Sequence, residues 1–128
     1  MTDLPERICA YLNGFGGRIC DLVPETMSDV NPCGGMFMKS AVKTRKYVDG
    51  SAVSEIPFEI RVRTDGVTVR EKLDVHEYFA AISAYVKDNP MAGDGICGME
   101  PVGGGERCAV LPGGDEEYRM EFVVSVKK

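Results

Sequence analysis

The fold of this chain is decided by one stretch, Pro57-Phe-Glu-Ile-Arg-Val-Arg-Thr-Asp-Gly66, followed closely by Asp74-Val-His-Glu-Tyr-Phe-Ala-Ala-Ile-Ser-Ala-Tyr-Val-Lys-Asp-Asn-Pro90. In the first part apolar and charged side chains alternate, with Phe58, Ile60 and Val62 on one face and Glu59, Arg61 and Arg63 on the other. This period of two predicts a β-strand with one buried face and one face in water. Asp65-Gly66 then supplies the residues of a turn.

The second part of the stretch has a helical period. Its apolar side chains recur at 3.6-residue spacing, at Val75, Tyr78, Phe79, Ile82, Tyr85 and Val86. Asp74 followed by Glu77 fits a capping box, so we expect the helix to begin near Asp74 or one turn earlier. Asn89-Pro90 ends it, because proline disfavours the helical conformation in the residue before it. We expect the apolar stripe of this helix to cover the apolar face of the strand.

A first helix is expected at the N-terminus, with Asp3 as its cap and a stripe formed by Leu4, Ile8, Tyr11 and Leu12. Asn13-Gly14 would end it, with Gly14 in the left-handed conformation. Residues 16–36 are rich in turn-forming residues and are predicted to be a long loop, with one short extended piece around Ile19–Val23.

The remaining segments favour strands. Residues 37–63 predict a long antiparallel hairpin that turns at Asp49-Gly50, with Pro57 at an edge or a bulge. Residues 91–105 are dense in glycine and are predicted to be a flexible loop, followed by a short strand at 106–111 and a turn at 112–115. The last strand spans 117–127, with its apolar face formed by Tyr118, Met120, Phe122, Val124 and Val126 and its polar face by Arg119, Glu121, Ser125 and Lys127.

These segments predict a single α+β domain over residues 1–128. It consists of an antiparallel β-sheet of two hairpins with two helices packed on one face, in the order α-β-β-α-β-β. A chain of 128 residues with 44% apolar residues can bury a sizeable core without disulfides.

The net charge of −5 argues against a general nucleic-acid-binding surface, although residues 39–46 form a local basic run. We interpret this run as a strand face in water or as a contact patch for a partner protein. The sequence has no apolar run long enough to span a bilayer and no signal-peptide pattern at Met1–Arg7. We therefore expect a protein made and kept in a cytoplasm, unless it leaves inside a larger particle.

The sequence offers little sign of catalysis. His76 is the single histidine and is expected to face solvent in the first turn of the helix. The cysteines are expected to be reduced core residues, since their spacing does not suit zinc: Cys9, Cys20, Cys33, Cys97 and Cys108. Residues 93–98 match G-x-G-x-x-G, but they follow a helix and not a strand, so no nucleotide cofactor is expected. The acidic run Asp115-Glu116-Glu117 is expected to be a solvated turn and not a metal site.

Four segments together resemble a known family: Lys46-Tyr-Val-Asp-Gly-Ser51, Ile56-Pro-Phe-Glu-Ile-Arg-Val-Arg63, the helix end Tyr85-Val86, and Tyr118-Arg-Met-Glu-Phe-Val-Val-Ser-Val126. They are similar to the bacteriophage minor capsid and tail-completion proteins, in particular to the tail terminators of siphophages. The likeness covers most of residues 1–128 and is a pattern of strands and aromatic positions. The glycine-rich segment 91–105 is longer than expected for the family.

The resemblance implies a non-enzymatic virion assembly protein of a phage or prophage. Such a protein forms a ring of identical subunits, a hexamer, which caps the tail tube, joins it to the head connector and lets DNA pass without binding it. Its place would be the head–tail junction of the virion, after synthesis in the bacterial cytoplasm. Lys43, Arg61 and Arg63 are the candidate interface residues, because they lie on predicted strand faces in water.

Two alternatives stay open at this point. One is a small thiol-dependent enzyme that uses one of the five cysteines together with His76. The other is a generic binding module of the host cell.

Overall fold

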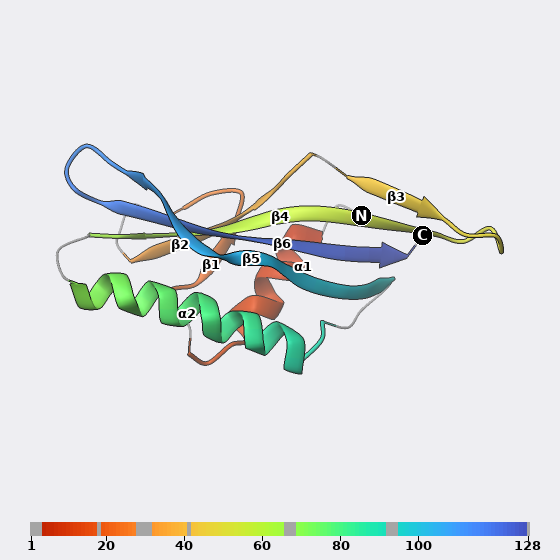
Figure 1. The fold of residues 1–128 in the computed structure, drawn as a ribbon, viewed down its shortest axis with the longest axis horizontal. Helices are drawn as coiled ribbons and strands as arrows, with labels where there is room; N and C mark the ends of the chain where they lie inside the picture. The colour runs from red at the N-terminus through yellow and green to blue at the C-terminus, as the bar shows by residue number, and fades with distance from the viewer. Residues whose placement is uncertain are drawn as a thin grey trace.

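A computed structural model describes residues 4–17, 19–27, 32–40, 42–65, 69–91 and 95–127, with the side chains of 69–72 excepted. It contains one strongly twisted sheet with both helices on the same side (Figure 1). The elements in chain order are α1 (Leu4–Asn13), β1 (Leu22–Pro24), β2 (Cys33–Met38), β3 (Lys43–Lys46), β4 (Ala52–Thr64), α2 (Val69–Asp88), β5 (Ile96–Val110) and β6 (Glu116–Lys127). The predicted α+β class with helices on one face is confirmed.

The sheet has six strands in the order β1-β2-β4-β6-β5, and β3 pairs with the beginning of β4. It is mixed and not purely antiparallel as predicted, because β1 runs parallel to β2. β4 and β6 form the centre through an unbroken antiparallel ladder from Val53↔Lys127 to Thr64↔Glu116.

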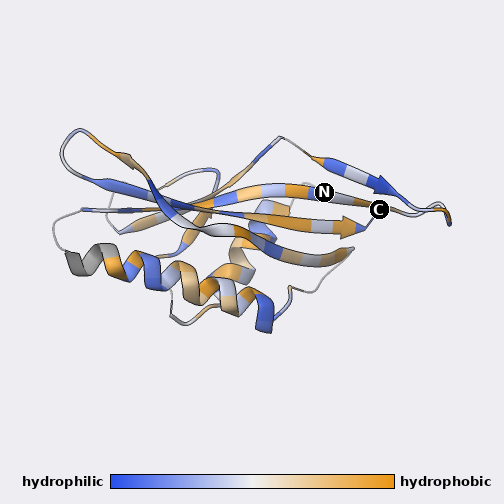
Figure 2. Ribbon diagram, viewed as in Figure 1, coloured by the Kyte–Doolittle hydropathy of each residue, from blue (hydrophilic) through white to orange (hydrophobic). Residues whose placement is uncertain are grey.

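The core lies between the sheet centre and α2. Phe58 of β4 stacks on Phe122 of β6, with ring centroids 5.4 Å apart, and both side chains are fully buried. The predicted apolar faces are confirmed, since β6 alternates buried and half-buried residues along its length. Figure 2 shows the same division: β6 carries long apolar stretches, whereas β3 is mostly hydrophilic.

The two helices occupy the predicted positions, and α1 begins at Leu4, directly after the predicted cap position. α2 begins at Val69, one turn before Asp74, and ends at Asp88 before Asn89-Pro90 as predicted. Its predicted stripe is buried at Val75, Tyr78, Phe79, Ile82 and Val86, with Tyr85 half-buried.

The end of the first helix is held against the sheet by polar contacts. The Asn13 side chain donates to the Leu22 carbonyl at 3.0 Å and accepts from the Leu22 N–H at 2.7 Å, which ties the helix end to β1. The predicted left-handed Gly14 is wrong. The chain leaves α1 through a tight turn, in which the Gly14 N–H donates to the Tyr11 carbonyl at 3.1 Å. The predicted cap Asp3 and the turn residue Gly66 lie outside the described residues.

The predicted loop at 16–36 is wrong in its second half, because Cys33–Met36 belong to β2. Gly34 and Gly35 serve close packing here and not a turn. A Cβ on Gly35 would lie 2.2 Å from the Thr26 carbonyl oxygen, so the segment before β2 passes directly over this strand.

The predicted flexible loop at 91–105 is also wrong, because most of it is β5. The strand has bulges at Ile96/Gly98, Val102/Glu106 and Arg107/Ala109, which absorb the glycine run. A Cβ on Gly105 would lie 1.9 Å from the Phe79 ring, so the backbone of β5 crosses this core side chain in direct contact.

The long predicted hairpin 37–63 is present in part. Its first strand divides into β2 and β3, which both pair with β4 and leave Pro57 facing the interval between them. Proline has no N–H to donate to a ladder, which explains a break at this position. The Pro57 carbonyl still accepts a hydrogen bond from the Lys39 N–H at 2.9 Å.

Candidate functional site

The most exposed continuous part of the described chain is a hairpin arm, which we define as residues 42–51. It consists of β3 and the turn that joins β3 to β4, and every residue from 42 to 50 is exposed. Figure 1 shows the arm extending beyond the ends of β5 and β6. Its ladder within the described chain is with Ala52–Glu55 at the start of β4.

The arm is ordered by its own hydrogen bonds. The Tyr47 N–H donates to the Ser51 carbonyl at 2.8 Å, and the Gly50 N–H donates to the Tyr47 carbonyl at 3.0 Å. Gly50 has a φ of 90°, which fits the predicted turn at Asp49-Gly50. The Asp49 carboxylate accepts from the Ser51 N–H and hydroxyl at 3.0 and 2.6 Å, and these bonds lower the Asp49 pKa.

Cations and apolar side chains share the surface of the arm. Lys43 and Lys46 make no ion pair with the described residues, while Arg45 pairs with Glu55 of β4 at 2.9 Å. Tyr47 is 52% exposed and Val48 is fully exposed at the tip. An aromatic and an aliphatic side chain beside unpaired cations are typical of a protein–protein contact surface.

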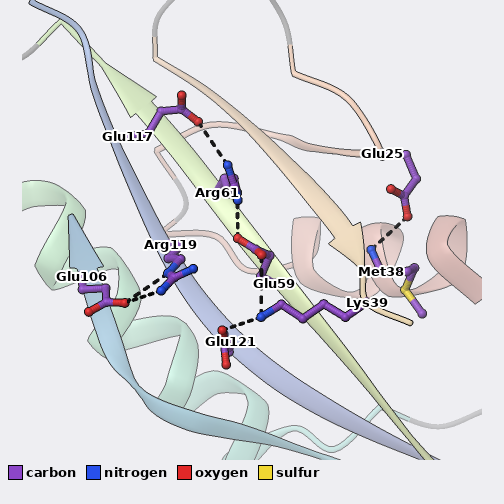
Figure 3. Close-up of polar contacts among 9 residues, drawn as sticks. All are labelled: Glu25, Met38, Lys39, Glu59, Arg61, Glu106, Glu117, Arg119 and Glu121. Atoms are coloured by element: carbon purple, nitrogen blue, oxygen red, sulfur yellow. Dashed lines mark hydrogen bonds and ion pairs between the residues drawn. The ribbon is translucent and has the colours of Figure 1, made fainter. Parts of the chain in front are cut away.

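The second feature is a set of paired charged side chains on the sheet face that the helices leave uncovered (Figure 3). We call it the charged ladder, and it consists of Lys39, Glu59, Arg61, Glu106, Glu117, Arg119 and Glu121. Arg61 Nε donates to Glu59 at 2.7 Å, and the Lys39 ammonium lies 3.8 Å from the same carboxylate. Further pairs join Lys39 to Glu121, Arg61 to Glu117 and Arg119 to Glu106. Positive and negative side chains from β4, β5 and β6, together with Lys39 just after β2, therefore pair across this face.

Glu59 is buried at 6% exposure, so the prediction that it faces water is wrong. The side chains of Arg61 and Lys39 cover it while they neutralise it. The hydrogen bond to Glu59 raises the Arg61 pKa, and the hydrogen bond from Lys39 lowers the Glu121 pKa. The cations of the ladder are therefore all paired with carboxylates, and the ladder presents no free cation to an anionic ligand.

The three predicted interface residues occupy different surroundings. Lys43 lies on the arm, opposite Glu55. Arg61 belongs to the ladder and also lies over the Phe37 ring at 5.7 Å, whereas Arg63 lies opposite Cys33 and bonds to it. Of the three, Lys43 alone lies on the arm.

The residues considered for catalysis are dispersed. His76 is exposed in α2, as predicted, and its ring meets the edge of the Tyr118 ring at 5.5 Å. It lies in the second turn of the helix and not the first, because α2 begins at Val69 and not at Asp74. Burial raises the pKa of Cys9 to about 11 and that of Cys20 to about 12. Such thiols are protonated at neutral pH and are poor nucleophiles.

The cysteine prediction is right for Cys9 and Cys33, which are buried, and wrong for Cys97 and Cys108, which are exposed. The two exposed thiols lie on β5, at the rim of the sheet, where a side chain is covered on one side only. Cys20 is half-buried.

The acidic run was predicted to be a solvated turn, and this is wrong for Glu116 and for Glu117, which both belong to β6. Glu117 is half-buried in this strand. Glu116 opens β6 and is 4% exposed, with Arg107 of β5 at 2.7 Å from its carboxylate. The turn itself lies earlier, where the Leu111 N–H donates to the Asp115 carbonyl. Within the described chain, no group of three acidic, cysteine or histidine residues could hold a metal ion.

The hollows on the described part of the chain include the following two. One of about 250 Å³ is lined by Ile19, Pro32, Thr64, Asp65 and Asp74. The other is shallow and wide, about 970 Å³, and touches the arm at Arg45 and Tyr47 and the β5 strand from Cys97 to Val102. Of the G-x-G-x-x-G match, Gly93 lies outside the described residues, Gly95 is a left-handed turn residue and Gly98 lies in a strand. In the part of the chain described, no helix combines the length and apolarity needed to cross a membrane.

Sequence reasoning missed Lys39 and Glu121 as partners, and it missed the burial of Glu59. The alternation of charge in the strands 58–63 and 118–126 gives the one available signal, because facing strands with opposite charges pair across a sheet. Comparison with protein-family models and with curated proteins gives no match to this chain.

Proposed function

We propose that this chain is a non-enzymatic assembly subunit of a bacteriophage or prophage virion, similar in role to the tail terminators. Six copies form a ring that caps the finished tail tube and presents a surface to the head connector. DNA passes through the ring without specific binding. The protein is made in the bacterial cytoplasm and acts at the head–tail junction of the virion.

The observation that carries this proposal is the arm. It is ordered by its own hydrogen bonds and is exposed from residue 42 to residue 50, and it adds no side chain to the buried core. An ordered element that the fold does not need for its core, with Tyr47 and Val48 in solvent, supports a role in contacts between proteins.

The charge distribution supports the same role. The ladder of the uncovered face is internally paired, and the chain as a whole carries −5. A ring of such subunits has little attraction for the phosphate backbone, and this favours passage of DNA over retention.

The thiol-dependent enzyme is the weaker candidate, because the pKa shifts of the thiols run against nucleophilic activity. The pKa values of Cys9, Cys20, Cys33 and Cys108 are all raised, in each case mainly by burial. A thiol that serves as a nucleophile is expected to have a lowered pKa and a base within hydrogen-bond reach.

Electron microscopy of the purified protein, alone and mixed with isolated tail tubes, tests the proposal. We expect closed rings, either free or at one end of each tube, and a matching oligomer in sedimentation velocity. A protein that stays monomeric at high concentration, and that leaves the tube ends bare, would exclude this function. Fast labelling of one cysteine by iodoacetamide at neutral pH would instead favour the enzyme.

A further inference from the structure

At the arm end of the sheet, β3 and β5 are the two outer strands, and each has one edge without a partner strand among the described residues. Here the strand order is β3-β4-β6-β5, so β3 and β5 take the outer positions. Within the described residues β3 pairs only with β4, and β5 pairs only with β6. The outer backbone groups of an edge strand are a ready template for another strand.

The open edges of β3 and β5 are aligned across the sheet, because their residues fall in the same rows of the strand register. One row across the sheet contains Lys43, Glu55, Ser125 and Gly98, and the next contains Thr44, Ser54, Val126 and Ile96. The beginning of β5 therefore lies level with β3, on the opposite side of the sheet.

The strand directions are also compatible. β3, β4, β6 and β5 are antiparallel at each step, so β3 and β5 run in opposite directions. A second copy placed in the same orientation beside β5 would present its β3 as one more antiparallel strand. The contact joins two different surfaces, which is the kind of interface that closes into a ring by rotation.

The chemistry of the two edges is complementary. The arm carries three cations against one carboxylate, so the rest of the chain holds a larger negative charge than its total of −5. Glu100 on β5 is exposed, has no ion pair within the described chain, and lies two residues after Gly98. Val102 is 49% exposed beside it and offers an apolar contact for the arm.

We propose that β3 of one copy adds to the open edge of β5 in a second copy of this chain, with Lys43 facing Glu100, since the register places both on the sheet face that the helices leave uncovered. The contact extends the sheet from copy to copy, head to tail. This inference rests on the proposed ring function, and it names the surfaces that join the subunits.

The native thiol of Cys97 makes a direct test available, because it is exposed at this level of β5. Single cysteines are placed at Lys43, Thr44, Arg45 or Lys46 in the Cys108→Ser background, and each protein is oxidised mildly with and without tail tubes. We expect at least one position to give a series of covalent multimers on a non-reducing gel. It should form roughly tenfold faster than any control, since a disulfide needs Cα atoms within about 7 Å.

Two controls accompany the scan. Each variant is repeated with Cys97→Ser, and Ala81→Cys places a thiol on the exposed face of α2, away from both edges. Neither control should give covalent multimers. Covalent dimers of the Cys108→Ser protein alone would show that two β5 edges pair with each other, and this would overturn the proposal.

The scan also separates this inference from the proposed function. If electron microscopy shows rings but none of the four cysteine positions gives covalent multimers, the β3–β5 contact is rejected and the ring function still stands. If neither rings nor covalent multimers form, alone or on tail tubes, both the β3–β5 contact and the ring function are rejected.

Discussion

The two ends of β4 differ more than any other pair of regions in this molecule. From Phe58 onward the strand lies between β2 and β6, and its apolar side chains are fully buried under the helices. At its beginning the same strand pairs with β3 and continues into the arm, where residues 42–50 are all exposed. One strand thus joins a part that stabilises the fold to a part that the core does not use.

This difference separates two kinds of substitution. Changes around Phe58 should alter the free energy of unfolding, because they remove buried contacts. Changes on the arm should alter association and leave folding almost unchanged, because exposed residues contribute little to stability. The predictions below test each side of this division.

The largest effect is expected from Phe122→Ala. The Phe122 side chain is fully buried and stacks on Phe58. Its removal should lower the free energy of unfolding by about 3–5 kcal/mol, through lost burial and the cavity left behind. Urea unfolding followed by circular dichroism measures this change. A loss below about 1 kcal/mol would mean that this pair is not at the centre of the core.

A smaller loss is expected from Gly105→Ala. The added Cβ would lie 1.9 Å from the Phe79 ring, so β5 or the ring must move, at a cost of about 1–3 kcal/mol. Gly104→Ala is the matched control, since a Cβ there meets nothing within 4 Å. Thermal unfolding of both variants compares them directly. Equal melting temperatures would show that β5 does not cross Phe79 in contact.

The ladder should give a modest, pH-dependent effect. Because the hydrogen bond from Lys39 lowers the Glu121 pKa, the stability that it contributes is present above the usual carboxyl range and is lost as the pH falls through the folded pKa. Wild type should therefore exceed Glu121→Gln by less than about 1 kcal/mol at pH 7, and the gap should close in acid. Glu100→Gln serves as the control, since Glu100 has no ion pair in the described chain. A gap that is constant with pH would show that the Lys39 pair is not formed.

The sequence predicted the elements whose signal is local. The alternation in 118–126 and the helical stripe from Val75 to Val86 depend on neighbours within one element, and both are confirmed. The Asp49-Gly50 turn is confirmed for the same reason.

The features that the sequence did not predict depend on contacts between distant residues. Gly35 and Gly105 are typical of loops when considered alone, yet each allows a strand to pass against Thr26 or Phe79. The strand pattern alone suggests that Glu59 faces water. In the fold, Lys39 and Arg61 pair with its carboxylate and cover it. Lys43 lies opposite Glu55, whereas Arg61 and Arg63 lie opposite Gly35 and Cys33, so the three predicted interface residues belong to different parts of the sheet.

The most direct test replaces the tip of the arm by Tyr47→Ser with Val48→Ser, and measures folding and assembly on the same protein. The matched control is Ala80→Ser with Ala81→Ser, on the exposed face of α2. We predict a free energy of unfolding within about 0.5 kcal/mol of wild type for both proteins, and rings that disappear for the arm variant alone, with or without tail tubes. Rings that assemble as in wild type, or an arm variant that fails to fold, would contradict the account.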